Sequence, residues 1–247
     1  GDSPGTETMN NSKTSSAWVL GICLVLGFSS LGYLLGQAAI RYKEYERTVT
    51  VKGLSEREYP ADIVIWPIPF TAANNDLGAL YEALEKSAGQ IREYLQAAGI
   101  EASEISMSVP LITDRAAQQW GDSSQAEFRY VAVQTVTVYS VQVDQVRTLM
   151  GGLIELGKRG IVFSGDAYQS QVEYLFTRLN EIKPGMIEEA TTAAREIGIK
   201  FANDSNSKLG KIRTASQGQF SIEPRDTNNP HIKKVRVVST VEYYLSD

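Results

Sequence analysis

Cysteine and histidine, which are often used for nucleophilic and acid–base catalysis, each occur once in this chain of 247 residues. Cys23 is the one cysteine and lies in an uncharged run, so no intrachain disulfide and no thiolate metal cluster can form. His231 is the one histidine and follows Pro230. We expect a surface residue in a turn there, although a lone histidine can also act as a general base or a pH switch. The sequence predicts no catalytic residue and no metal site.

Carboxylates are numerous but scattered. A hydrolase that uses two carboxylates needs a pair that converges in a cleft, and spacing in the sequence does not identify one. Most of these side chains are expected to cap helices or to face solvent. Asp62 follows Pro60 at the start of a strand, where a carboxylate can hold a turn by accepting backbone N–H groups. The carboxylates considered are Asp62, Asp76, Glu85, Asp144, Asp166, Glu173, Glu188 and Glu189.

Nucleotides and nucleic acids are poor candidates as ligands. The glycines near Gly151-Gly152 are not followed by the Gly-Lys-Ser/Thr sequence of a phosphate loop, and we predict no cofactor. The net charge is −5, which argues against a protein that binds phosphates through clustered lysine and arginine.

Two places in the sequence could contact partners. Lys233, Lys234 and Arg236 give the last predicted strand a basic character, which usually marks a solvated face but could meet anionic lipid or an acidic protein. Trp120 lies in a polar stretch with no obvious core to enter, so it either contacts a partner or folds back on its own domain.

The most prominent segment is the uncharged run from Ala17 to Ile40. A helix of this length is about 36 Å long and can cross a hydrocarbon core of about 30 Å. The alternative is a cleaved signal peptide, with small residues at Gly36 and Ala38 as the cleavage site. The side chains expected to contact lipid are apolar: Trp18, Leu20, Leu24, Leu26, Phe28, Leu31, Leu34 and Leu35.

The segments around this run set the expected orientation. Residues 1–16 are predicted to be flexible, with residues 1–8 an added or processed end and Met9 the natural start. Lys13 precedes the run, whereas Arg41, Lys43 and Arg47 follow it in the linker of residues 41–47. The positive-inside rule then favours a cytoplasmic C-terminal domain, but only by two charges.

The remaining chain alternates short strands with two longer helices. Alternation predicts a strand from Thr48 that ends in a turn at Gly53, and the prolines within Ile63–Ala72 predict an edge or bulged strand. Helical spacing predicts a helix that Asn75 or Asp76 caps and that Gly99 ends. A hairpin follows, formed by residues 105–113 and 128–143, with an exposed loop at residues 114–127.

A second round has the same order. It comprises a helix capped by Asp144, short strands, a helix whose first residue is Pro184, and a hairpin of residues 209–215 and 234–245. The predicted fold class is α+β: antiparallel sheets with helices packed on one face, in two β-α-β-β-like units at about residues 48–143 and 144–247, preceded by one transmembrane helix.

Several stretches resemble the SIMPL-domain family. They are Thr48-Val-Thr-Val-Lys-Gly53-Leu-Ser with Pro60-Ala-Asp62, Leu95-Gln-Ala-Ala-Gly99-Ile100, Phe128-Arg-Tyr130-Val-Ala, the alanine-bearing helix of residues 187–201, and Lys208-Leu-Gly210-Lys-Ile212. The resemblance covers residues 48–246. It implies an exported domain in the bacterial periplasm or envelope, ring-like homo-oligomers and a link to oxidative-stress tolerance, and it carries no catalytic residues onto this chain.

Three functions remain open at this point. The first is an anchored, non-enzymatic scaffold or adaptor of the inner membrane, with its domain in the periplasm or released there by cleavage. Its expected partners are lipid and further copies of itself, but not nucleic acid, and other partners are not identified. The second is a carboxylate-based envelope hydrolase. The third is a channel-like ring over clustered anchor helices, which needs many copies because one helix per chain cannot form a pore.

Overall fold

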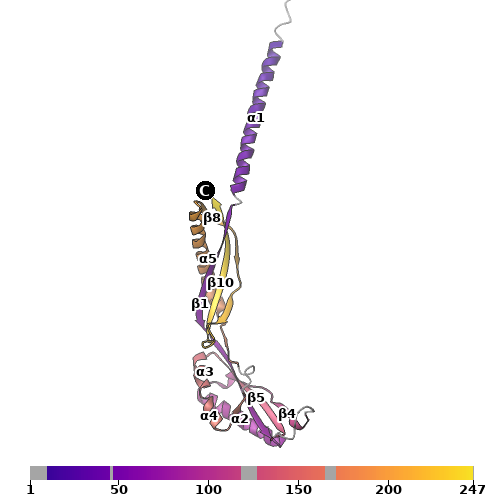
Figure 1. Ribbon diagram of the computed structural model, residues 1–247, viewed down its shortest axis with the longest axis vertical. Coiled ribbons are helices and arrows are strands. Elements are labelled where there is room, and N and C mark those ends of the chain that lie inside the picture. Colours follow the sequence, from indigo (N-terminus) through magenta and orange to yellow (C-terminus); the bar gives the residue numbers. More distant parts are fainter. Residues whose placement is uncertain (1–9, 45–46, 118–126, 165–170, 247) are drawn as a thin grey trace, which may run out of the picture. The chain divides into compact units, whose positions relative to one another are not determined.

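A computed structural model describes residues 10–44, 47–117, 127–164 and 171–246 (Figure 1). It combines helices with antiparallel sheets and one N-terminal apolar helix, which confirms the predicted fold class. The chain forms two compact units that interleave in sequence. The first unit comprises Gly1–Ser55, Ile187–Gln219 and Val238–Asp247, and the second comprises Glu56–Met186 and Phe220–Val237. Residues 143 and 144, where a boundary was expected, both lie in the second unit.

The second unit contains an antiparallel sheet built around two long strands, β2 and β5. The eleven residues from Val64 to Asn74 pair with β5 without a shift in register. The short strands β3 and β4 pair with the other edge of β5, while β6 and β7 pair with β2. The strands are β2 (Ile63–Asn74), β3 (Ile105–Met107), β4 (Leu111–Asp114), β5 (Tyr130–Ser140), β6 (Val162–Phe163) and β7 (Glu173–Leu175).

The prolines of β2 do not place it at the sheet edge, contrary to expectation. β5 lies on one side, and β7 and β6 pair with the two ends of β2 on the other side. Pro67 and Pro69 fall between these two pairings, where their missing N–H groups interrupt no described ladder bond. Pro69 still takes part through its carbonyl oxygen, which accepts from Ser164 N at 2.9 Å.

Helix α2 (Leu77–Ala97) covers this sheet as its sequence predicted. The Asp76 carboxylate accepts from Ala79 N at 2.8 Å, which satisfies one of the free N–H groups of the first turn. Its buried side chains pack into one core with β2, β5 and the helices α3 (Val143–Met150) and α4 (Leu153–Lys158). The buried face of α2 consists of Leu80, Leu84, Ala88, Ile91 and Leu95.

Two expected helix starts are wrong. The N-cap of α3 is Gln142, so Asp144 lies in the first turn rather than at the cap. Helix α5 (Leu179–Asp204) begins before Pro184, which lies inside it. A proline one turn into a helix removes one backbone hydrogen bond, so the pattern that places proline at the first position misjudged this boundary.

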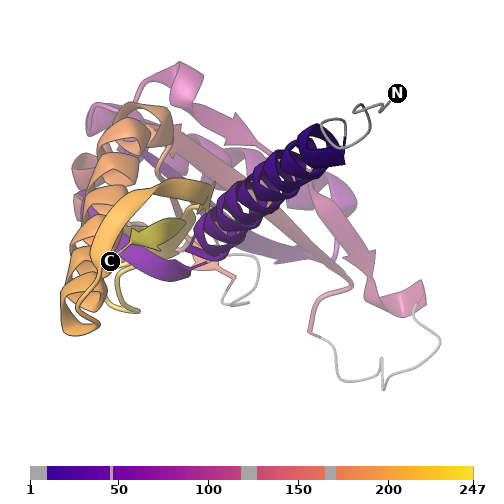
Figure 2. The ribbon, with the colours of Figure 1, turned by 90° about the horizontal axis from the view of Figure 1, so that it is seen from above.

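The first unit contains the parts of β1 (Thr48–Pro60) and β10 (Ile232–Ser246) nearest the apolar helix, together with β8 (Lys208–Gln217) and most of α5. The strand order is β1-β10-β8, and β9 (Ser221–Pro224) pairs with the start of β10 in the second unit. Figure 2 shows α5 in orange beside the gold and yellow strands of this sheet. Both arms of the expected last hairpin are therefore present.

Gly53 does not end β1; it lies in the middle of the strand. A Cβ atom at this position would stand 1.8 Å from Ala190 O and 2.4 Å from Ala194 N, which is far inside any real contact distance. Gly53 thus lets the backbone of β1 approach the backbone of α5. The glycine marks a close packing contact rather than a turn.

Candidate functional site

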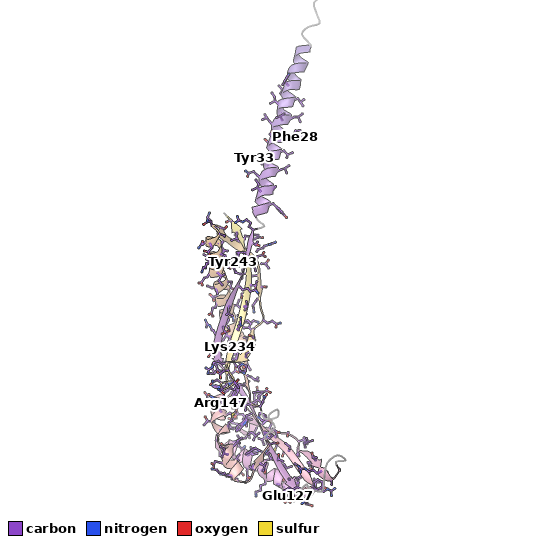
Figure 3. The ribbon with its side chains drawn as sticks, in the orientation of Figure 1. Phe28, Tyr33, Glu127, Arg147, Lys234 and Tyr243 are labelled. Carbon is purple, nitrogen blue, oxygen red and sulfur yellow. The ribbon has the colours of Figure 1, made fainter. Side chains whose placement is uncertain are left out.

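The apolar helix α1 (Asn10–Glu44) contains a 23-residue stretch, Trp18–Ile40, that is long and apolar enough to cross a membrane. Each of the eight predicted anchor side chains, from Trp18 to Leu35, is at least half exposed. Phe28 and Tyr33 project from the helix in Figure 3. The only polar contact described there joins Gln37 Nε2 to the Tyr33 hydroxyl at 3.1 Å. Length and composition fit a membrane anchor and a signal sequence equally.

His231 lies in the turn just before β10, as expected, but it is half-buried rather than fully exposed. Its ring meets the Tyr174 ring edge-on, with 6.0 Å between the centroids, and its Nδ1 atom is buried without a hydrogen-bond partner in the described part of the chain. Burial lowers the pKa of this imidazole, and the positive charge of Arg147 acts in the same direction. The ring is therefore held in its neutral form.

The predicted basic residues of β10 do not share one surface. Lys233 is buried, at 8% exposure, on the same side of the strand as Val235 and Val237, whereas Arg236 is exposed. Lys234 lies on the side of Arg236 and is partly exposed (Figure 3). Burial lowers the pKa of the Lys233 amine. Strand alternation splits the basic cluster, and its role in binding partners stays a prediction. Trp120 lies outside the described residues.

Asp62 accepts a backbone N–H group, as expected, but from a distant segment rather than within a local turn. Its carboxylate accepts from Thr177 N at 2.9 Å and from Thr177 Oγ1 at 2.9 Å, and Arg178 Nε lies 3.5 Å away. These bonds join the start of β2 to the residues that follow β7. A carboxylate engaged in this way fixes the backbone.

Other carboxylates form separate local pairs. Arg129 donates two hydrogen bonds to Asp114, which lowers the pKa of the Asp114 carboxyl. Arg225 donates to Asp226 at 2.9 Å, and this bond, with those from Asn229, lowers the pKa of Asp226 to about 2. Within residues 10–44, 47–117, 127–164 and 171–246, no group of three His, Cys, Asp or Glu side chains could hold a metal ion. Asp166 lies outside this part of the chain.

A groove that sequence reasoning missed lies beside α2. It has a volume of about 440 Å³ and lies between one flank of the helix and the Met107–Pro110 segment, with Gln134 of β5 beneath. Met107 in its wall is 39% exposed, and Val109 of the same segment is 88% exposed. The one sequence sign of it is Pro110, which separates β3 from β4. The α2 residues of the groove are Tyr81, Leu84, Glu85, Ala88, Gly89 and Arg92.

Comparison with known proteins identifies the domain. The family model SIMPL, described as a protein of unknown function (DUF541), matches residues 49–242. The match runs from the second residue of β1 to Glu242 within β10. No curated protein matches the chain significantly. The chain belongs to the SIMPL family.

Proposed function

We propose that this chain is a membrane-anchored protein of the bacterial envelope that forms homo-oligomers and acts as a scaffold or adaptor rather than as an enzyme. The observation that carries the proposal is the joining of an apolar helix of membrane-spanning length to a folded SIMPL domain. A helix satisfies its backbone within lipid, so α1 can hold every copy at one surface. Confinement to a surface raises the local concentration of domains and favours their association.

The exposed surface of the domain also supports self-association. Val109, Leu111 and Val141 each expose more than two thirds of their area, and Ile154 and Val162 are more than half exposed. Exposed apolar side chains of this size are common where proteins bind one another. The proposal assigns such side chains to contacts between copies, arranged as a ring.

The first test measures the mass of the full-length chain in mild detergent. Light scattering coupled to size exclusion should give a multiple of the 27.2 kDa chain mass after the detergent contribution is subtracted. The same preparation should show no turnover of cell-wall or carbohydrate substrates. A strictly monomeric protein would remove the assembly, and a monomer that turns over a substrate would remove the whole proposal.

The proposal places the domain on the periplasmic side of the inner membrane. Protease added to intact spheroplasts should degrade the domain, and mass spectrometry of the mature chain should recover the α1 peptides. Protection from the protease would place the domain in the cytoplasm. Recovery of a chain without α1 would instead establish the alternative, in which the helix is a signal peptide and the domain is free in the periplasm.

A role in oxidative-stress tolerance is the last part of the proposal, and it rests on the family resemblance alone. A strain that lacks the protein should survive peroxide less well than its parent. Restoring the full chain should recover survival, whereas a chain without α1 residues should not if anchoring is needed. Equal survival of the deletion strain and its parent would remove this role while leaving the scaffold.

A further inference from the structure

We propose that α2 is a homodimer contact, in which α2 of one copy lies antiparallel to α2 of a second copy across a two-fold axis near Gly89. This inference deepens the self-association proposed above and rests on it. It commits to one occupant for the groove beside α2, namely the same face of a second copy.

The charged residues on either side of Gly89 are self-complementary. At 100° per residue, Glu85 and Arg92 lie on one flank of the exposed face of α2, and Lys86 and Glu93 lie on the other flank. All four side chains are exposed, and none forms an ion pair with another described residue. Within one flank the two opposite charges are seven residues apart, which is about 10.5 Å along the helix and too far for a direct pair.

A two-fold axis makes these charges meet. Such an axis sets each flank against the same flank of the second copy and reverses the helix direction. Glu85 of one copy then faces Arg92 of the other, Lys86 faces Glu93, and each pair occurs twice. In a parallel dimer the two-fold axis runs along the helices and sets each flank against the opposite flank, so Glu85 would face Lys86 and Arg92 would face Glu93. Both arrangements pair unlike charges, but only the antiparallel one sets the groove flank of one copy against the groove flank of the other.

Gly89 lets the two helices come close. A Cβ atom added there would meet nothing within 4 Å, so the glycine is not required by packing inside its own chain. Glycine in the middle of a helix costs about 1 kcal/mol relative to alanine. At a helix crossing it removes the side chain that would otherwise keep the backbones apart, as in other close helix pairs.

The groove supplies apolar area on one flank of this contact. Leu84 and Ala88 form its buried side, and Met107 and Pro110 form the opposite side. The segment next to it is held in place: Ser108 N donates to Thr135 O at 2.9 Å, Thr135 N donates to Ser108 Oγ at 3.0 Å, and Gln134 Nε2 donates to Ser108 O at 2.9 Å. Val109 is therefore presented to solvent by a fixed backbone.

The two-fold axis brings the two grooves together, because each flank of α2 meets the same flank of α2 in the second copy. Burial of Met107 and Pro110 from both copies, with Val109 of the same segment, then adds apolar area to the helix contact. Helix α2, with 21 residues, is about 31 Å long and about 10 Å wide, so the segment of Met107 to Pro110 must add to the helix face to approach the roughly 800 Å² that each partner contributes to a standard interface.

Disulfide trapping tests the proposal on the full-length chain in detergent. The Cys23→Ser background removes the natural cysteine, and Gly89→Cys places one thiol at the axis, where a bridge needs Cα atoms within about 7 Å. Mild oxidation should convert most of this variant into a covalent dimer on non-reducing gels. The matched control is Ser103→Cys in the same background, an exposed position in the second unit off α2, which should stay monomeric on the gel.

Charge reversal gives the sharper readout. Adding Glu85→Arg to the Gly89→Cys chain should lower the initial rate of dimer trapping by about five-fold, since two attractive pairs become repulsive. Adding Arg92→Glu as well should restore the rate, because each new arginine again faces a glutamate. Restoration is expected only if the pairs join two copies. Thermal unfolding by circular dichroism should be unchanged in all these variants.

The outcomes separate this contact from the proposed function. If the wild type is assembled in detergent but Gly89→Cys yields no covalent dimer, or if the double reversal stays slow, the α2 contact is wrong while self-association stands. If the wild type is monomeric by mass and the cysteine variant is not trapped, both fail. A trapped dimer with loss and recovery under charge reversal supports both.

Discussion

Helices α2 and α5 each cover a sheet, but they pack against it in opposite ways. Helix α2 fills the space with large side chains such as Leu84 and Ile91, which keep its backbone away from the sheet. The part of α5 in the first unit presents Ala190 and Ala194, and its backbone comes close to that of β1 at Gly53. Large side chains stabilise through apolar area removed from water, whereas small ones stabilise through many close atomic contacts.

This difference determines what each helix tolerates. A contact made by long side chains can adjust when one of them is shortened, at the cost of a cavity. A contact made by two backbones has no flexible part, so any added atom must move a whole element. We therefore expect α5 to be more sensitive to added volume and α2 to be more sensitive to lost volume.

The largest effect is expected for Gly53→Val. The new side chain would occupy the position of the Ala190 backbone, so α5 must leave the sheet, and the loss of stability should exceed about 4 kcal/mol. Hydrogen exchange should show the loss of protection in α5 and β1. The control is Gly185→Ala in the same helix, where a Cβ meets nothing within 4 Å and a slight gain is expected. Unchanged exchange in α5 of the valine variant would contradict the close contact.

The converse test removes volume from α2. Ile91 is fully buried, and Ile91→Ala should cost about 3 kcal/mol through lost transfer energy and a cavity. The milder Ile91→Val should cost about 1 kcal/mol. Both can be measured by urea unfolding, with hydrogen exchange to confirm that the second unit is the part affected. Equal costs for the two variants would mean that the site collapses around the smaller residue, contrary to the packing described.

A smaller effect is expected at Ser55, which joins β1 to α5. Its hydroxyl donates to Glu189 Oε2 at 2.9 Å and is almost fully buried. Ser55→Ala should cost about 1.5 kcal/mol, because a hydrogen bond to a charged carboxylate is lost. Ser103→Ala, at an exposed position, should change stability by less than about 0.5 kcal/mol and serves as the control. A neutral Ser55→Ala would show that this bond adds nothing to the close packing.

The smallest effect concerns the start of α2. Asp76→Ala removes the bond to Ala79 N and should cost about 1 kcal/mol. Asp76→Asn keeps an oxygen that can accept the same bond and should retain most of the stability. Exchange of the first-turn amides of α2 reports the change directly. If alanine and asparagine variants exchange alike, the cap does not hold the helix start.

The sequence predicted α2 well and α5 less well, for the same physical reason. Large apolar residues at helical spacing and a capping carboxylate leave a clear pattern, so Asp76 and Gly99 bounded α2 correctly. Contacts made by alanine and glycine leave a weak pattern, so Gly53 was taken for a turn and Pro184 for a helix start. Which segments share a unit depends on long-range pairing of β1 and β10, and local patterns do not encode it.

Of the candidate functional features, only the apolar helix was predicted correctly from the sequence. The composition of the Trp18–Ile40 segment identifies it at once. Lys233 was assigned to a basic surface because its neighbours in sequence are charged, although its alternation with Val235 and Val237 indicates the buried face. The groove beside α2 depends on how the backbone at Val109 and Pro110 leaves the sheet. Pro110 marks the position in the sequence, but it does not predict that geometry.

The last strand ends beside the residue at which the first strand begins. Leu245 N donates to Arg47 O at 2.8 Å, and Arg47 follows the end of α1 by three residues, which span at most about 11 Å. With α1 in a bilayer, a fluorophore attached to Ser246 would sit within reach of quenchers on lipid headgroups. With the quenchers placed in one leaflet at a time, labels at this one position would report both the face of the membrane that bears the domain and the loss of α1 by cleavage, since release would abolish quenching from either leaflet.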